Sequence, residues 1–549
     1  MLHGHCNRTG LQIPAFVLAL RTHFDAFRAD PRTYLLATWW RLCGLKLRAR
    51  NLMSPLLGSS PLAYRRWLDL DIKRKIEVEQ EAPVQIIALI APHSDPKENE
   101  KTRTSILREG MHAIFLGSEE WPETSVSPNT INWNATPWLM PMDGGDILAL
   151  GSGPAYRAAI AQHGNCNLIY ADDDLRDLRD KRCSPCFKPD WNGELFSGSD
   201  FLTGACILEG QRDDFAALPP TGWARTLVNA ALARAKMQPG RAGDPGAPAH
   251  IRQILHHRRD RPPVCVPLRT APDADTLPSL SVIIPTRNRL ELLRKCLEGL
   301  ASTSYPDIEI IVVDNDSDDA ATLAYLDQLD PAFCRVLRHH GPFNFSAINN
   351  HAVRESRGEL LCLLNNDVEI VHSDWLSILA QQALRKDVGA AGAQLLYPDG
   401  RIQHAGVVLG VGGGAAHAHR LFYPAEEGYF QRHQLPQFVS AVTAACLVVR
   451  RDRFDAVGGL DEEHFTVSFN DVDLCMKLNE KGWQSLYEPR AQLIHHESIS
   501  RGFDRDPVGA ARLASELAEL KARWGTGTQV DPYHHPELSP FSERFVVRL

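Results

Sequence analysis

The 549-residue chain lacks a long hydrophobic run and several common signatures of function. No apolar stretch reaches the 18 or so residues that a membrane-spanning helix needs. The first ten residues, MLHGHCNRTG, have neither the charge pattern nor the cleavage site of a signal peptide. Neither GxGxxG nor GxxxxGK[ST] occurs, so a dinucleotide site or a P-loop has little support. We therefore expect a protein that is not exported and does not span a membrane.

Excess positive charge and a disulfide framework are also missing. The 59 Lys and Arg residues stand against 67 Asp and Glu, a formal net charge of −8, so nucleic acid is not expected as a partner. Twelve Cys show no disulfide spacing, and Cys362, Cys446 and Cys475 lie in apolar runs, as small core residues do. This fits a reducing cytoplasm. The single CxxC of Cys183 and Cys186 favours two ordinary thiols over a zinc site.

Basic residues do cluster locally, in WWRLCGLKLRAR at residues 39–50. Residues 33–58 combine Leu and Trp with Arg and Lys. This composition fits peripheral contact with an anionic membrane surface, and it equally fits an amphipathic helix packed on the next domain.

The length predicts two or three domains, and a hydrophobic content of 44% is ordinary for a folded protein. Stretches rich in Pro and Gly at 237–250 and 264–280 mark loops and a linker. Strands and helices then alternate, which predicts a doubly wound, mostly parallel α/β sheet. The predicted strands are 281–285, 308–314, 335–339 and 359–365, and the predicted helices are 289–302, 319–328, 346–356 and 373–384.

A weaker version of this plan precedes the linker, with predicted strands at 84–92, 112–117 and 166–174. The two halves therefore look like tandem copies, the first of them degenerate. The expected organisation is an N-terminal helical region (1–75), the degenerate copy (76–268), the main domain (279–505) and a C-terminal helix and tail (506–549).

Polar residues follow three strands of the main domain. They are Pro285 to Asn288 after the first strand, Asp314 to Ser317 at the end of the second, and Asn365 to Asp367 after the fourth. The carboxyl ends of parallel strands share one edge of a sheet, where ligands bind in open α/β folds. Three such ends predict a polar pocket, although the last triplet on its own could equally be an Asx-rich turn before a helix.

Six blocks of this region resemble the family-2 glycosyltransferases of the GT-A (nucleotide-diphospho-sugar transferase) fold. They are SVIIPTRNR, IEIIVVDNDSDD, GELLCLLNNDVEI, SAVTAACLVVRRDRFDAVGGLDE, FNDVDLCMKL and AQLIHHESISRG, and they span about residues 279–505. In the first half, NLIYADDDLRD, SPCFKPDWN and HIRQILHHR resemble blocks of tandem bacterial chains similar to rhamnosyl and O-antigen glycan transferases.

The resemblance implies a nucleotide-sugar donor and a divalent metal, Mg²⁺ or Mn²⁺. Asp367 matches the last Asp of the family's DxD metal motif, with Asn365 at the place of the first. His495 matches the late metal-site histidine, and His496 is the weaker candidate. The implied donor-binding residues are Pro285, Thr286, Arg287, Asn288, Asp314 (on base or ribose), Asn315, Asn349 and Asn366.

By the same resemblance, Asp471 is the catalytic base, with Asp473 as the alternative and Asn470 at the place of the usual preceding acid. Asp471 also falls in the first turn of a predicted helix, where its charge would complement the dipole. A single base implies inversion at the anomeric carbon. Gly458 and Gly459 are placed near the acceptor, and we interpret the Gly-rich segment 402–420 as a mobile loop over the site.

In the first copy, either Asp143 and Asp146 or the run Asp172 to Asp174 takes the place of the DxD motif. We expect that copy to fold without transferring sugar. The main domain is expected to be an inverting, metal-dependent transferase. It would move a hexosyl or deoxyhexosyl group from a UDP-, dTDP- or GDP-linked donor to a glycan or lipid-linked acceptor in cell-surface polysaccharide synthesis. Because Asn365 and Asn470 depart from the family pattern, a catalytically silent glycan-binding scaffold is the alternative.

Overall fold

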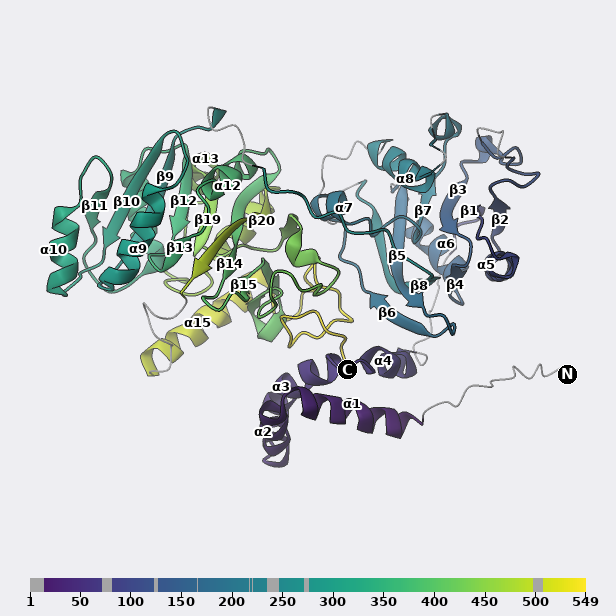
Figure 1. The fold of residues 1–549 in the computed structure, drawn as a ribbon, viewed down its shortest axis with the longest axis horizontal. Helices are drawn as coiled ribbons and strands as arrows, with labels where there is room; N and C mark the ends of the chain where they lie inside the picture. The colour runs from purple at the N-terminus through teal and green to yellow at the C-terminus, as the bar shows by residue number, and fades with distance from the viewer. Residues whose placement is uncertain are drawn as a thin grey trace.

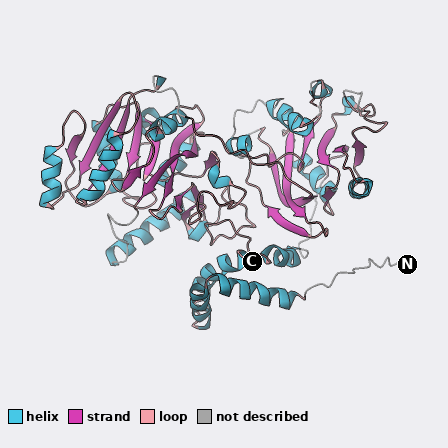
Figure 2. Cartoon of the chain, viewed as in Figure 1, coloured by secondary structure: helices cyan, strands magenta, loops and turns pink. Residues whose placement is uncertain are grey.

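A computed structural model describes residues 14–71, 81–122, 127–164, 166–216, 218–219, 221–234, 246–270, 276–496 and 507–549. Two twisted β-sheets with helices around them lie beside each other, and a group of N-terminal helices lies below them in the view of Figure 1. Both halves combine a β-sheet with helices (Figure 2). The predicted α/β class is therefore confirmed.

Four helices form the N-terminal group: α1 (Ala15–Ala29), α2 (Pro31–Leu42), α3 (Lys46–Gly58) and α4 (Ala63–Asp71). Asp30 caps α2, because its carboxylate accepts the backbone N–H of Thr33 at 3.0 Å, and Pro31 opens the helix. The expected single helix over 33–58 is two helices, since Gly44 adopts a left-handed φ of 80° between them.

The first sheet has the strand order β2-β1-β3-β7-β5-β8-β4, with β6 paired to β5. Its strands are β1 (Ile86–Ala91), β2 (His112–Phe115), β3 (Trp138–Asp143), β4 (Ile147–Leu148), β5 (Leu168–Arg176), β6 (Arg182–Cys186), β7 (Cys206–Glu209) and β8 (Ala249–Arg258). The helices of this half are α5 (Pro96–Arg108), α6 (Ser152–Gln162), α7 (Gly193–Gly198) and α8 (Trp223–Arg234). The strands predicted at 84–92, 112–117 and 166–174 are confirmed as β1, β2 and β5.

The second sheet has the order β11-β10-β9-β12-β19-β14-β20-β13, with β15 on β14 and β18 on β20. Its strands are β9 (Leu280–Thr286), β10 (Ile308–Asp314), β11 (Arg335–Arg338), β12 (Leu360–Leu364), β13 (Val368–Ile370), β14 (Val388–Leu396), β15 (Ile402–His404), β18 (Gln437–Val439), β19 (Cys446–Arg450) and β20 (Gln484–His495). A hairpin of β16 (Val407–Leu409) and β17 (Ala415–His417) stands apart. Helices α9 (Leu290–Ala301), α10 (Ala320–Gln328), α11 (Phe345–Glu355), α12 (Trp375–Ala383), α13 (Arg451–Ala456), α14 (Asn470–Glu480) and α15 (Pro507–Trp524) complete this half.

The two sheets share one topology. The path β2-β1-β3-β7-β5-β8-β4 matches β10-β9-β12-β19-β14-β20-β13, strand for strand and in chain order. Each matched pair of neighbours also has the same direction: the first two pairs and the fifth are parallel, and the others are antiparallel. Parallel pairing thus dominates only up to β12, and the rest of each sheet is mixed. This repeated topology agrees with the expected tandem arrangement.

Apolar patterning explains why the strands that carry the predicted site are rigid. All seven residues of β9 and all five of β12 are buried, as expected for strands covered on both faces. Helix α9 buries Leu293, Cys296, Leu297 and Leu300, the spacing of a single helical face, against this sheet. Burying one such leucine contributes about 1.5–3 kcal/mol, so the strand ends are fixed by a well-packed core.

Buried contacts join the two halves. The Asn192 side chain exchanges two hydrogen bonds with the backbone of Phe438, at 2.9 and 3.2 Å. Glu194 pairs with Arg385 at 2.8 Å. In the C-terminal segment, the Pro532 carbonyl accepts the backbone N–H of Asp190. Among the described residues, no helix has both the length and the apolar character needed to cross a membrane.

Candidate functional site

Three strand ends meet around Thr286. The parallel register places Asp314 of β10 opposite Thr286 of β9, so both strands end at the same level. The Asn315 backbone N–H donates to the Thr286 carbonyl at 2.9 Å. The Asn366 amide donates to the Thr286 hydroxyl, also at 2.9 Å. The polar groups predicted after separate strands are therefore tied together at one edge of the sheet.

A cavity of about 1170 Å³ opens at this edge. Its size exceeds the 300–1,000 Å³ or so of pockets for drug-sized ligands. The wall comes from the loop after β9, the 365–367 triplet, the β16–β17 hairpin, residues 443–445 and 467–472, the end of β20, and the start of α15.

Eight of the predicted site residues lie on the wall of this cavity. They are Pro285, Thr286, Arg287, Asn288, Asn366, Asp367, Asp471 and His495. Five others do not line it: Asp314, Asn315, Asn349, Gly458 and Gly459.

Asp314 and Asn315 face neighbouring loops and strands. Asp314 is buried, and its carboxylate pairs with the Arg338 guanidinium of the adjacent strand β11 at 2.5 Å. The Asn315 amide donates to the carbonyls of His339 and Gly341, at 3.1 and 3.0 Å. In this conformation both side chains brace the edge of the sheet beside the cavity.

Asn349 and the two glycines have structural surroundings. Asn349 is fully buried in α11, where its amide donates to the Phe345 carbonyl at 2.8 Å. A Cβ at Gly459 would lie 2.8 Å from atoms of both Asn350 and Phe454, so a side chain has no room there. Gly458 adopts a φ of 77° with open space around it, as a turn requires.

Strand pairing brings Asp367 and His495 together. Val368 of β13 pairs with His495 of β20, so the residue before Val368 lies beside the imidazole. Asp367 Oδ1 is 3.1 Å from His495 Nε2, and the two residues are only 3% and 5% exposed. The Asn365 amide lies 3.4 Å from the same nitrogen. His496 turns away to Glu369, at 3.1 Å.

This set of donors fits a divalent cation. It offers one carboxylate and one imidazole, with an amide whose oxygen and nitrogen are interchangeable in assignment. Mg²⁺ and Mn²⁺ commonly take one or two carboxylates and complete their coordination with phosphate oxygens and water. The pair also faces an open cavity, so substrate oxygens can reach the ion.

Asp471 lies in the first turn of helix α14 and also lines the cavity. Phe469 adopts a left-handed φ of 61°, and α14 begins directly after it. The Asp471 carboxylate accepts the backbone N–H of Val472 at 2.8 Å and that of Ala444 at 3.1 Å. Two backbone donors therefore fix the orientation of a carboxylate that borders the cavity.

Asp473 faces the other way. Its carboxylate is fully buried, paired with Arg523 at 2.9 Å and Lys477 at 3.1 Å, and it accepts the Trp524 indole N–H at 3.0 Å. A carboxylate with these partners does not border the cavity. Of the two alternatives for the base, only Asp471 lies on the wall.

The sequence reasoning missed a histidine pair on the hairpin side of the cavity. The backbone N–H groups of Gly406 and Thr443 lie 3.3 and 3.4 Å from His404 Nε2, which places the His404 proton on Nδ1. That atom is 2.8 Å from His417 Nδ1. Burial, with His417 and His495 nearby, lowers the pKa of His404 well below its usual range, so the ring is neutral.

His417 itself borders the cavity, as does Arg512 of α15. Both histidines belong to the Gly-rich segment 402–420, which was predicted to cover the site. Their contact joins the end of β15 to β17, and nothing in the sequence indicated it. Arg512 lies in an ordinary amphipathic helix, and no sequence pattern distinguishes it.

The first sheet has an equivalent edge with different chemistry. Ile147 of β4 pairs with His257 of β8, just as Val368 pairs with His495, so Asp146 and His257 correspond to Asp367 and His495. Of the acidic residues proposed for the DxD place, Asp146 is the one that occupies it. The Arg258 guanidinium lies 3.6 Å from its carboxylate, while His257 pairs with Asp174 at 2.7 Å.

In the first copy, the two residues that correspond to the proposed metal ligands already have other partners. Burial raises the pKa of Asp146 to about 7, although Arg258 opposes that shift. Arg258 supplies positive charge beside Asp146, whereas Asp367 lies beside His495 on the cavity wall.

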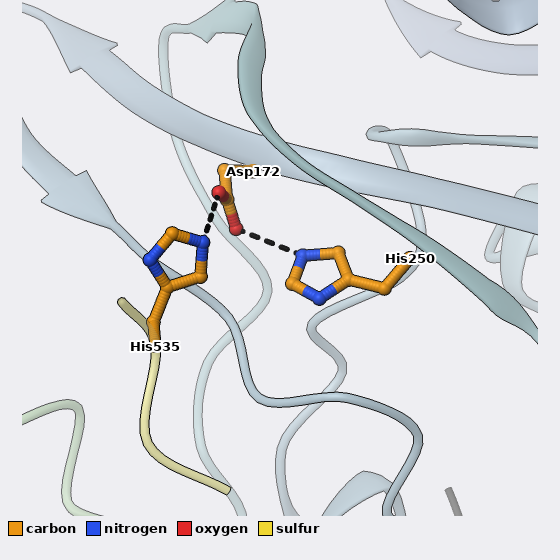
Figure 3. Close-up of side chains that lie close together, drawn as sticks. All are labelled: Asp172, His250 and His535. Carbon is orange, nitrogen blue, oxygen red and sulfur yellow. Dashed lines mark hydrogen bonds and ion pairs between the residues drawn. The ribbon is translucent and has the colours of Figure 1, made fainter. Parts of the chain in front are cut away.

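A separate buried cluster joins the first half to the C-terminal segment (Figure 3). Asp172 lies between His250, at 3.1 Å, and His535, at 2.9 Å. These three are close enough to be considered as metal ligands. However, His535 Nδ1 accepts the Glu537 backbone N–H at 3.0 Å, so its proton is on Nε2, the atom facing Asp172. The Asp172 carboxylate therefore lies between an imidazole of His250 on one side and the Nε2–H of His535 on the other.

His250 carries the positive charge of this cluster. Its two ring nitrogens face Asp172 and Asp190, at 3.1 and 3.0 Å. Burial alone would lower the pKa of His250, but the two carboxylates outweigh it and raise the pKa above its usual value. The imidazolium thus clamps Asp172 to Asp190 within the first half.

Comparison with known proteins finds a family match within the second half of the chain. Residues 281–458 match the family described as Glycosyl transferase family 2. A Sinorhizobium fredii protein, y4gI, is 40% identical over 71% of this chain and 47% of its own length. The O-antigen biosynthesis protein RfbC of Myxococcus xanthus is 33% identical over 68% of this chain and 31% of its own. The present chain thus spans less than half the length of either relative.

Two further proteins are more distant. The N-acetylglucosaminyl-diphospho-decaprenol L-rhamnosyltransferase of Mycobacterium tuberculosis is 26% identical over 46% of this chain and 86% of its own. Among solved structures, the mannosyltransferase PcManGT of Pyrobaculum calidifontis, in complex with GDP-Man and Mn²⁺, is 17% identical. It covers 49% of this chain and 70% of its own, with a TM-score of 0.36.

Proposed function

Because residues 281–458 form a glycosyltransferase family 2 domain, we propose that the chain is an inverting, metal-dependent transferase. It moves a hexosyl or deoxyhexosyl group from a nucleotide-sugar donor to a glycan or lipid-linked acceptor. The named functions of the Myxococcus and Mycobacterium relatives support an acceptor used in bacterial cell-surface polysaccharide synthesis. The reaction takes place in the cytoplasm or at the inner face of the membrane.

The donor occupies the edge of the second sheet. Its diphosphate lies near Arg287, Arg289 and Arg512, which all line the cavity and together supply positive charge for an anionic ligand. Asn288 and Asn366 hold the loop ends that border it. Asp314 and Asn315 support this edge from behind, and a nucleotide base reaching past the loop would contact them only after a side-chain rearrangement.

Asp367 and His495 hold the divalent ion in this proposal. When bound there, Mg²⁺ or Mn²⁺ neutralises the negative charge that grows on the departing diphosphate. The protein's part is to fix the carboxylate and the imidazole 3.1 Å apart at a wall that the phosphates can reach. His417 adds an imidazole on the same cavity, suited to donating a hydrogen bond to ligand oxygen.

Asp471 acts as the base. It removes the proton from the acceptor hydroxyl as that oxygen attacks the anomeric carbon on the face opposite the diphosphate. The sugar bond to the new oxygen forms while the bond to the phosphate oxygen breaks, so the configuration inverts. The two backbone donors to Asp471 hold its orientation during this step.

The observation that carries the proposal is the convergence of Asp367, His495 and Asp471 on one cavity from three separate segments of the chain. Nucleoside diphosphate release can be measured with UDP-, dTDP- and GDP-linked sugars, with Mn²⁺, with Mg²⁺ and with chelator. We expect release with one donor class, dependent on the metal and lost in Asp367→Ala. Glycan binding without turnover of any donor would select the silent scaffold instead.

The first copy is proposed to be inactive in transfer. Arg258 beside Asp146 supports this assignment, because its guanidinium already pairs with the carboxylate that corresponds to Asp367 of the proposed metal site. Its extensive contacts with the second half fit a supporting role.

A further inference from the structure

The N-terminal helices carry an apolar face that no described residue covers. On α1, the exposed large apolar residues are Phe16, Leu20, Phe24 and Phe27. Their spacing of four, four and three places them along one side of the helix. Leu18, Thr22 and Ala26 are the buried residues of α1, and they lie on the opposite side. The helix therefore packs on the protein with one face and presents a second apolar face outward.

Helix α2 has an exposed apolar side of its own. Leu35, Leu36, Trp39 and Leu42 are exposed, and positions 35, 39 and 42 again share one side. Exposure reaches 76% at Phe16 and 78% at Leu42. A helix on the surface of a soluble domain normally shows charged and polar residues there, and a contiguous apolar patch marks a site of interaction.

The charge of the N-terminal helices indicates what kind of partner binds to their apolar face. Residues 15–50 contain seven Arg and Lys, all exposed, against only Asp25 and Asp30, in a chain whose net charge is −8. Both carboxylates are engaged: Asp25 accepts the Ser60 hydroxyl at 2.6 Å, and Asp30 caps α2. Arg21 and Arg28 directly follow Leu20 and Phe27 in the sequence, so they flank the apolar stripe one helical step away.

Apolar side chains flanked by arginines are the pattern of a helix lying in a membrane interface. We propose that α1 and α2 form a docking surface for an anionic lipid bilayer. The aromatic and leucine side chains enter the boundary between headgroups and acyl chains, while the arginines contact lipid phosphates. A second copy of this chain would bring one net-positive surface against another, so charge favours lipid. The inference does not rest on the transferase proposal, because lipid binding requires no donor, metal or turnover.

Flotation of the full chain with vesicles tests the proposal. We compare vesicles of phosphatidylcholine with vesicles containing 30% phosphatidylglycerol, at about 0.1 and 0.5 M salt. We expect partitioning at least about tenfold stronger on the anionic vesicles, and about a tenfold weakening at the higher salt. Equal binding to both compositions, or none, overturns the proposal.

Paired variants distinguish binding through this surface from nonspecific adsorption to vesicles. The triple variant Phe16→Gln, Leu20→Gln, Phe24→Gln keeps helix-forming residues and should lose about a hundredfold in partitioning. The matched control Leu150→Gln, Leu178→Gln, Leu268→Gln removes three other highly exposed leucines and should bind as the parent does. Circular dichroism and melting temperature verify folding, and Arg21→Gln, Arg28→Gln, Arg32→Gln provides a second test that leaves the apolar residues intact. A stable dimer abolished by the first variant, without vesicle binding, would assign the surface to a second copy and refute the proposal.

Discussion

Substitution of two aspartates in the first turn of α14 is expected to have opposite effects on turnover and stability. Asp471→Asn removes the proposed base but leaves a side chain of the same shape. General base catalysis contributes about 10² to 10⁴ in rate, which is about 2.7–5.4 kcal/mol of barrier at 1.36 kcal/mol per tenfold. We expect the turnover number to fall by that factor.

The folded state should change much less. Asp471 accepts two backbone N–H groups, at 2.8 and 3.1 Å. The asparagine amide has one oxygen, so one of these donors loses its acceptor at a partly exposed position, costing about 1 kcal/mol. The melting temperature should therefore drop by only a few degrees, and binding of nucleoside diphosphate with Mn²⁺, read by thermal shift, should persist.

Asp473→Asn is the matched control. Its carboxylate is fully buried against Arg523, Lys477 and the Trp524 indole. Removing one partner of a buried ion pair leaves uncompensated positive charge and costs about 3–5 kcal/mol. We expect marked destabilisation, with turnover per folded molecule nearly unchanged. If Asp471→Asn retains turnover within threefold, or if Asp473→Asn lowers turnover without lowering the melting temperature, the assignment of roles on this helix is refuted.

Three further predictions follow from other parts of the chain. His495→Ala should raise the Mn²⁺ concentration for half-maximal activity by about tenfold or more, whereas His496→Ala, which removes only the contact with Glu369, should leave it unchanged; equal effects would argue against His495 as a ligand. The raised pKa of His250 means that the folded chain holds its proton more tightly than the unfolded chain, so this stabilisation is complete below about pH 6.5 and is lost as pH rises through the folded pKa. The denaturation midpoint should accordingly fall more between pH 6 and 8.5 in the parent than in His250→Gln, and parallel pH profiles would contradict the clamp. Finally, Asp146→Asn in the first copy should leave the metal dependence of transfer intact, because Arg258 already supplies the local positive charge; a shifted Mn²⁺ requirement would show that the first copy takes part in metal binding.

The sequence by itself determined the local structure and most of the second sheet. Continuous apolar runs such as LLCLL and IIVVD leave a strand no alternative but burial on both faces, so β12 and β10 were predictable within a residue or two. The polar residues after these runs located the edge of the sheet where Thr286, Asn366 and Asp367 line the cavity, because strand polarity alone fixes which ends meet.

Composition and periodicity do not decide which of several neighbouring residues faces that cavity, although the family resemblance already favoured Asp471 and His495. Asp471 and Asp473, or His495 and His496, are indistinguishable by composition, and they separate only because a helix and a strand turn neighbouring side chains to different faces. The pairing of Asp146 with Arg258 likewise depends on the register between β4 and β8, across more than a hundred residues. The exposure of the α1 stripe was equally hidden, since a periodic apolar face is the same in sequence whether it packs on the protein or remains uncovered. Local patterns encode what each segment can bury, and long-range packing decides against what it is buried.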